Sequence, residues 1–252
     1  MRERREPWSF TELVGHYTGV LLLLAVPRES AAALLPPEIL LGEQPLTPAG
    51  LHPVLLWFGR QREVHLTHLR HLPGFPIDYL EAIGGVPFVH PAGSRRTEPC
   101  LNLVQLYLDA PLAILGGVTL WGFPKKPARM HEEAQRFEAC SLLRREPLLR
   151  CETELTGPSG PATRLPHVRA FAEVLAQPLL QGAAGNMGPA VGSLFRWALA
   201  EAAVQPARVR LRLFDRFLPG LAGQYTVPSV EEAPLGALHL ESHWRLSLPY
   251  LP

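Results

Sequence analysis

The stretch Arg208-Val209-Arg210-Leu211-Arg212-Leu213 alternates basic and apolar residues at every second position. Side chains of a β-strand point alternately to its two faces, so this alternation predicts a strand with one buried face and one face in water. Residues 238–246 alternate in the same way, with leucines and a tryptophan opposed to histidines, a glutamate and an arginine. Both segments are typical of half-buried antiparallel strands.

Further apolar segments bounded by turn residues predict additional strands at residues 20–26, 54–58, 101–108, 118–121, 137–143 and 148–155. Eight or so strands joined by short turns favour a sheet that curls or closes, because closure removes exposed edges. We therefore predict a mainly β (β-rich α+β) fold: an antiparallel, barrel-like sheet with a central cavity and a few flanking helices.

Three segments predict helices. Residues 30–35 form a short apolar run with Ser30 as its cap, stopped by Pro36 and Pro37. Residues 168–180 and 193–204 have helical spacing, the second with Ser193 as its cap. Residues 182–189 between them are mostly small and predict a connecting loop. No change of composition divides the chain, so we expect one domain over residues 1–252.

The charge balance argues against a highly charged partner. The 252 residues include 24 basic and 23 acidic ones, for a net charge of +1, and no basic stripe is present. This pattern is not typical of proteins that bind nucleic acid or an anionic membrane. The apolar run at residues 19–26 is too short to span a bilayer, and Glu3, Glu6 and Glu12 argue against a signal peptide. A cytoplasmic protein is expected.

Two groups of metal-type residues lack the spacing of a metal site. The cysteines have no Cys-x-x-Cys pair and are odd in number, which argues against a zinc knuckle or a disulfide framework: Cys100, Cys140 and Cys151. The histidine triplet has a spacing of three, which on a strand puts neighbours on opposite faces: His65, His68 and His71. We expect no metal.

The sequence Trp121-Gly122-Phe123-Pro124-Lys125-Lys126-Pro127 ends a nearly apolar run that starts at residue 113. Adjacent lysines commonly form a solvated turn, and on composition alone this interpretation stays open. The apolar run favours a second one, in which the pair lies at the lip of a buried pocket. Burial and a neighbouring cation both disfavour the ammonium form, which would make Lys125 a nucleophile.

The residues around the lysines resemble the acetoacetate decarboxylase family, whose signature ends in aromatic-Pro-Lys-Lys. Tyr107-Leu108-Asp109 precedes this signature, and Tyr79-Leu80-Glu81 is similar to the family's Tyr-x-Glu further upstream. Leu211-Arg212-Leu213-Phe214-Asp215 resembles a Leu-x-Leu-Phe-Asp strand near the C-terminus, and residues 30–40 resemble an early helix with a Pro-Glu turn. The matches keep the family's order from about residue 17 onward.

This resemblance implies roles for three residues. Lys125 would condense with a substrate ketone to form a Schiff base, and Lys126 would destabilise its proton. Activation of a lysine by desolvation or by an adjacent cation is the behaviour of acetoacetate decarboxylase itself, so both roles are carried over by resemblance. Glu81 would handle a proton or organise the lysine, although a simple ion pair with an arginine is an equal alternative. No cofactor is implied.

The resemblance also places substrate-binding residues at Tyr17, His16, Phe123, Trp121 and Tyr79. Near His16 and Tyr17 the family has an arginine that engages the substrate carboxylate, and this chain has none there.

The family's second pocket glutamate is also absent from residues 54–59. A bidentate guanidinium is the natural clamp for a carboxylate. Arg28, Arg60 or Arg62 could replace it from elsewhere, and otherwise the pocket suits a less acidic compound.

We therefore expect a Schiff-base-forming lyase, similar to acetoacetate decarboxylase, whose partner is a small keto acid or a related carbonyl compound. Two alternatives remain: the same imine chemistry used for aldol condensation or dehydration, and a non-catalytic barrel that binds an apolar small molecule. The resemblance also makes a homo-oligomer an expectation.

Overall fold

Three long neighbouring strands dominate the fold: β1 (Leu13–Pro27), β3 (Leu51–Leu66) and β4 (Ile77–Pro91). The computed structural model describes residues 12–71, 74–93, 98–181 and 191–250. β1 pairs antiparallel with β3, and β3 with β4. Their central residues are buried without interruption, because both faces of this part of the sheet are covered.

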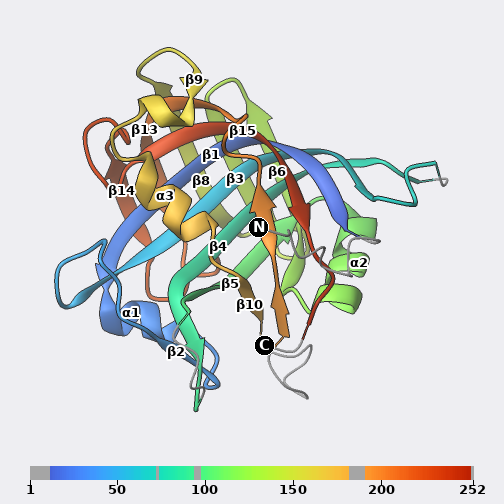
Figure 1. Cartoon of the computed structure of the whole chain (residues 1–252), viewed down its shortest axis with the longest axis horizontal. Helices are drawn as coiled ribbons and strands as arrows, with labels where there is room; N and C mark the ends of the chain where they lie inside the picture. The colour runs from blue at the N-terminus through green and yellow to red at the C-terminus, as the bar shows by residue number, and fades with distance from the viewer. Residues whose placement is uncertain (1–11, 72–73, 94–97, 182–190, 251–252) are drawn as a thin grey trace, which may run out of the picture.

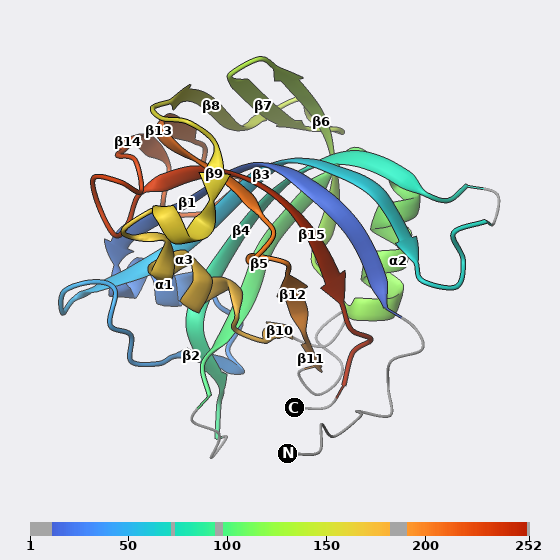
Figure 2. The ribbon, with the colours of Figure 1, turned by 45° about the horizontal axis from the view of Figure 1, so that its top comes forward.

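The sheet closes into a barrel (Figures 1 and 2). Nine strands pair in the order β5-β6-β7-β8-β13-β15-β1-β3-β4, and β4 pairs with β5 to complete the circle. This arrangement confirms the predicted mainly β, barrel-like fold. The further barrel strands are β5 (Cys100–Leu108), β6 (Lys125–Glu133), β7 (Arg136–Ser141), β8 (Pro147–Leu155), β13 (Ala203–Leu213) and β15 (Ala237–Leu246).

Six shorter strands flank the barrel in the described residues: β2 (Ile39–Leu41), β9 (Gly160–Pro161), β10 (Leu179–Gln181), β11 (Val191–Ser193), β12 (Phe195–Trp197) and β14 (Gly223–Val227). Three α-helices are described with them: α1 (Arg28–Ala33), α2 (Pro111–Trp121) and α3 (Val168–Leu175). Figure 2 shows α3 and β10 to β12 in front of the long strands, and α2 at one end of the sheet. No helix in the described part of the chain is long and apolar enough to cross a membrane.

One pair of barrel strands is parallel, namely β5 and β6. A parallel pair needs a crossover connection, which is usually a helix, and α2 is that connection. Residues 118–121 are therefore helical, and the predicted strand there is wrong. The start and stop signals are in the sequence: Pro111 occupies the first turn, and Gly122 ends α2 in the left-handed conformation with φ 66°.

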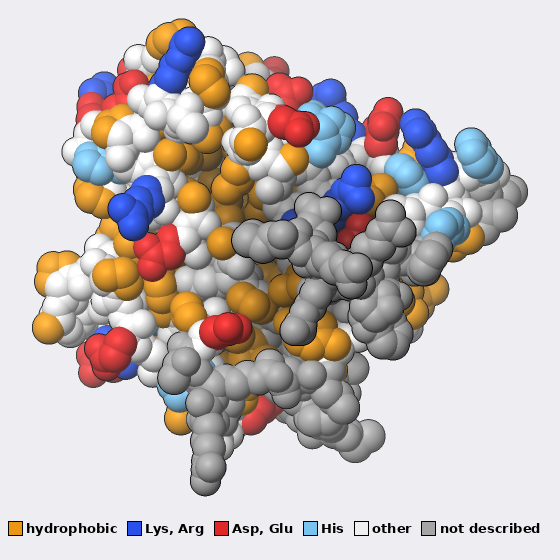
Figure 3. Space-filling model, viewed as in Figure 1, with side chains coloured by type: hydrophobic (Ala, Val, Ile, Leu, Met, Phe, Trp, Pro, Cys, Tyr) orange, Lys and Arg blue, Asp and Glu red, His pale blue; other side chains and the backbone are white. Residues whose placement is uncertain are grey.

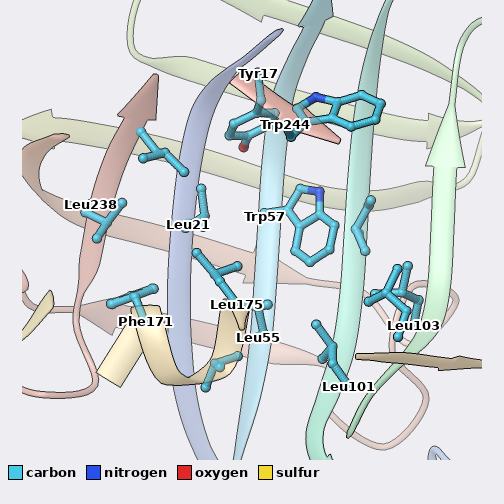
Figure 4. Packing of buried hydrophobic residues seen from close by; sticks show 14 of the residues in the cluster. Tyr17, Leu21, Leu55, Trp57, Leu101, Leu103, Phe171, Leu175, Leu238 and Trp244 are labelled. Carbon is cyan, nitrogen blue, oxygen red and sulfur yellow. The ribbon is translucent and has the colours of Figure 1, made fainter. Parts of the chain in front are cut away.

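The barrel strands bury two separate sets of side chains. The barrel core fills the inside of the closed sheet and includes Val20, Phe58, Phe137 and Leu211. The helix-side core lies on the opposite face of the long strands, under α3 and α2. Figure 4 shows part of it, with Tyr17 from β1, Trp57 from β3 and Trp244 from β15 on one side and Phe171 and Leu175 from α3 on the other. Both cores exist because alternate residues of one strand point to opposite faces.

Two predicted helices differ from the structure. The helix predicted over residues 193–204 is wrong, since this region holds the end of β11, then β12, and the start of β13. Phe195 and Trp197 pair with β15, so tertiary pairing overrides a weak local helical pattern. The helix predicted over 168–180 ends at Leu175, and β10 follows.

The first helix begins earlier than predicted. α1 starts at Arg28 after Pro27, and no side chain caps it, so the predicted capping role of Ser30 is wrong. The loop predicted at residues 182–189 lies outside the described residues.

Candidate active site

Lys125 is the first residue of β6 and lies on the helix-side face of the sheet. It pairs with Leu106 of β5, which belongs to the helix-side core, whereas Lys126 pairs with Tyr107 of the barrel core. Successive residues of a strand point to opposite faces, so the two lysines diverge. The desolvated lysine therefore lies outside the barrel interior, between the sheet and α2.

The side chain of Lys125 runs along α2. Its Nζ donates a hydrogen bond of 3.0 Å to the carbonyl oxygen of Ala113. Its outer methylenes cross Gly117 so closely that a Cβ at that position would overlap them and lie 2.7 Å from Nζ. Only a residue without a side chain leaves this path free.

Two aromatic rings lie near Nζ, and Lys125 as a whole is half-buried, so one side of it meets solvent. The ring centroid of Tyr79 lies 5.9 Å from Nζ and that of Phe123 lies 5.8 Å from it. Burial lowers the pKa of Lys125 from 10.5 to about 8, and the negative charge of Glu81 partly opposes this change. The lysine therefore loses its proton in a pH range where an ordinary lysine keeps it.

Glu81 lies on the same face as Lys125, two strands away. It belongs to β4 and pairs with Leu108 of β5, two residues beyond the partner of Lys125. Its carboxyl is buried, which raises the pKa, while hydrogen bonds from Gln61 and Trp57 and the charge of Lys125 lower it. The ion pair with an arginine, one of the two interpretations of this glutamate, is not formed among the described residues.

A chain of hydrogen bonds holds the Glu81 carboxylate. Trp57 Nε1 donates to Glu81 Oε1 at 2.9 Å, and Gln61 Nε2 donates to the same oxygen at 2.6 Å. Gln61 Oε1 in turn accepts a hydrogen bond of 2.7 Å from Trp244 Nε1. The two tryptophans and Gln61 are buried, so this polar network is closed off from bulk water on the side of β3 and β15.

The structure differs from the role expected for Lys126. This residue is exposed, its Nζ donates to Gln105 Oε1 at 2.7 Å, and it lies 5.7 Å from the ring centroid of Tyr107. Burial is the cause of the lowered pKa of Lys125, and the charges that act on Lys125 do not include Lys126. Adjacent positions in the sequence are separated here by the plane of the sheet.

Tyr17 and His16 also point to opposite faces of β1. Tyr17 is fully buried in the helix-side core, and its hydroxyl donates to the carbonyl oxygens of Val20 and Phe58. His16 lies 3.4 Å from Glu241 and lines a separate surface cavity of about 600 Å³. The structure brings neither polar group to Lys125.

Phe123 lies beside Lys125, and Trp121 packs against Phe123. Their rings stack with centroids 6.4 Å apart and planes inclined by 10°, and Trp121 Nε1 donates to the carbonyl of Ser247. Tyr79, Phe123 and Glu81 are thus the predicted residues that surround the lysine, with Trp121 one layer further back. Figure 3 shows hydrophobic side chains gathered in the middle of the face that is viewed in Figure 1.

The arginines considered as carboxylate clamps are engaged elsewhere. Arg28 donates to the carbonyl oxygens of Leu41 and Gly42, and Arg60 pairs with Glu132. The positive charge of Arg62 lowers the pKa of His16, and it is not among the charges that shift the pKa of Lys125. Within the described residues, the charge that acts on Lys125 is that of Glu81 alone.

The histidine triplet does not converge. His65 Nδ1 contacts the carbonyl oxygen of Glu63, and His68 and His71 are exposed in the turn that follows β3. In the part of the chain that the structure describes, no three metal-type side chains are grouped to hold an ion.

Sequence reasoning missed Gln61, Trp244 and Gly117 as site residues. Gln61 and Trp244 are 183 positions apart and meet only through the strand pairing of β1 with β3 and β15. Gly117 carried a usable signal, because a Gly116-Gly117 pair in an apolar run predicts a close approach. The approaching group is the side chain of Lys125.

No family model and no curated protein matches the sequence. Solved structures do match it in fold. Acetoacetate decarboxylase from Legionella pneumophila superposes with a TM-score of 0.60 at 15% identity, over 99% of this chain and 93% of that one. An acetoacetate decarboxylase-like enzyme from Sphingomonas wittichii RW1 gives a TM-score of 0.59 at 13% identity, over 99% and 97%.

A third match is the enduracididine biosynthesis enzyme MppR, in complex with the condensation product of pyruvate and imidazole 4-carboxaldehyde. Its TM-score is 0.59 at 16% identity, over 96% of this chain and 88% of that one. The resemblance found in the sequence motifs is thus confirmed at the level of the fold. This chain has the fold of the acetoacetate decarboxylases and the enzymes similar to them.

Proposed function

We propose that this protein is an enzyme similar to acetoacetate decarboxylase, in which Lys125 forms a Schiff base with a small carbonyl substrate. One observation carries the proposal: burial against α2 lowers the pKa of Lys125 to about 8. At pH 7 roughly one such lysine in eleven is neutral, compared with about one in 3,000 for a lysine of ordinary pKa. The neutral, nucleophilic fraction of Lys125 at pH 7 is therefore about 300-fold larger than that of an ordinary lysine.

The chemistry follows from this neutral amine. Nζ attacks the carbonyl carbon, and the carbonyl oxygen leaves as water with the two protons of the amine. The imine nitrogen takes up one further proton from solvent to become the protonated imine. The imine then accepts an electron pair from a neighbouring bond, either the bond to a departing carboxylate or a C–H bond at the α-carbon. Glu81 is the group on this face that can take up or return the proton, since burial raises its pKa.

The surroundings support a carbonyl compound whose reacting end carries little charge. The walls beside Nζ are the rings of Tyr79 and Phe123, and no described arginine acts on Lys125 or Glu81. A carboxylate in such a site would lack its bidentate partner. Among the variants of imine chemistry, aldol condensation or dehydration therefore fits better than decarboxylation of a keto acid. The condensation product bound to MppR supports a condensation reaction by analogy, but it derives from pyruvate and so does not support the absence of a carboxylate.

Reductive trapping tests the proposal. Borohydride is added to the protein with each of a panel of ketones, aldehydes and keto acids, and the intact mass is measured. We expect an adduct on Lys125 that Lys125→Ala abolishes and Lys126→Ala retains. An adduct of equal yield in Lys125→Ala, or none with any compound of the panel, contradicts the imine.

The remaining alternative is a barrel that binds an apolar molecule without reacting. In that case Lys125→Met retains ligand binding, and the lysine titrates near its ordinary pKa. A cytoplasmic location and a homo-oligomer stay predictions.

A further inference from the structure

The hydrogen-bond network around Glu81 has a fixed direction. An indole N–H can only donate, so the group of Gln61 that faces Trp244 must be its carbonyl oxygen. The amide NH2 of Gln61 then has to point the other way, to Glu81 Oε1 at 2.6 Å. Trp244 therefore determines which end of the Gln61 amide meets the carboxylate.

The two oxygens of the carboxylate are consequently unequal. Oε1 accepts from both Gln61 Nε2 and Trp57 Nε1, and both of these groups are donors with no lone pair to offer in return. A proton on Oε1 would face two other protons. The second oxygen, Oε2, receives no hydrogen bond from the described residues. A proton on Glu81 therefore belongs on Oε2.

We propose that Gln61, oriented by Trp244, is a positioning residue that makes Oε2 the proton-carrying oxygen of Glu81 and keeps its carboxylate usable as a base. The inference rests on the proposed function in one respect, namely that Glu81 exchanges a proton with the imine. The step balances: an α-proton of the imine moves to Oε2, and its electron pair forms the enamine and neutralises the iminium nitrogen. Return of the proton reverses both changes.

Burial and the network act on Glu81 in opposite directions. Burial disfavours the ionised carboxylate, and the two donors favour it. Loss of the Gln61 donor should leave Glu81 protonated over a wider pH range, and so unable to act as a base there. Loss of the Trp244 donor should have a similar effect only while Gln61 is present, since Trp244 acts through it.

Titration of the Glu81 carboxyl carbon by 13C NMR tests this directly, with the signal identified by its loss in Glu81→Gln. Gln61→Leu should raise the midpoint by about 1 pH unit, the equivalent of one hydrogen bond to a charged group. Trp244→Phe should raise it less, and the double variant should match Gln61→Leu alone. Gln105→Leu, the same change at a residue that bonds Lys126, should leave it unchanged. An unmoved midpoint in Gln61→Leu, or additive effects, overturns the inference.

A second measurement separates positioning from damage to the fold. Deuterium exchange into acetone reports α-proton transfer, and borohydride trapping with acetone reports imine formation. Gln61→Leu should reduce exchange, by up to about 10-fold at pH values where Glu81 is mostly protonated, and leave the trapped fraction within about twofold. A parallel loss of both overturns the positioning role. Absence of any adduct in the unaltered protein instead contradicts the proposed function, while the NMR titration still decides the role of Gln61.

Discussion

Replacement of Gly117 by alanine should disable Lys125 while the fold is retained. A Cβ at position 117 would lie 2.7 Å from Nζ and overlap the two outer methylenes of Lys125. Ordinary contact between carbon atoms needs about 3.5 Å, so the end of the lysine must move by roughly 1 Å. This movement also breaks the hydrogen bond from Nζ to Ala113.

The clash involves the far end of a flexible side chain, so relief is easy and the loss of stability should stay below about 1 kcal/mol. Alanine is also favoured over glycine within a helix by about 1 kcal/mol, which offsets it. Misplacement of a reacting group by 1 Å can reduce a rate about 100-fold. We expect adduct formation in Gly117→Ala to be 10- to 100-fold slower.

Gly116 provides the matched control. It lies in the same helix, and a Cβ there would meet no atom within 4 Å. Gly116→Ala should form the borohydride adduct at the unaltered rate and gain thermal stability from the helix. The assay is the rate of adduct formation at pH 7 by intact mass, with thermal denaturation alongside. Equal adduct rates in Gly117→Ala and Gly116→Ala would refute the packing argument.

Three further predictions concern the charges of the site. Lys126→Met should leave the pH midpoint of adduct formation near 8, because burial lowers the pKa of Lys125; a rise toward 10 would show that the neighbouring charge matters. Glu81→Gln should lower that midpoint, because it removes a negative charge that raises the pKa of Lys125, and it should stop deuterium exchange; a midpoint that rises contradicts this. Lys125→Met should stabilise the protein by roughly 1–3 kcal/mol below pH 8. The unfolded lysine binds its proton up to about 10.5, so this gain should shrink as the pH rises from about 8 to 10.5, and denaturant unfolding at several pH values measures it.

Much of the fold could be predicted from periodicity alone. Residues 208–213 and 238–246 alternate because one of their faces meets the barrel core or the helix-side core and the other meets water. β6 was missed because most of its residues are polar or charged, and it buries only Ala128 fully. β12 was missed because three residues carry no period, and only the pairing with β15 makes them a strand.

The site could be predicted only where its residues are close in the sequence or carry a motif. Lys125 stood out as a lysine after an apolar run and Glu81 through its resemblance to a Tyr-x-Glu motif, and the structure places both on one face. Gln61 and Trp244 gave no local signal, because their contact depends on the register of three strands. The assumption that Lys126 acts on Lys125 took neighbours in the sequence for neighbours in space.

The parallel pairing of β5 and β6 has a consequence for how this protein can change. Three residue pairs set the alignment of β6 at this point, from Leu106 with Lys125 to Leu108 with Pro127. A shift of one residue would turn Lys125 toward the barrel and bring Lys126 under α2. Which of two identical side chains serves as the nucleophile is thus decided by the length of the connection after Gly122. Deletion of one residue there would place Lys126 opposite Leu106, and insertion of one residue would place it opposite Leu108, on the same face but one pair closer to the partner of Glu81.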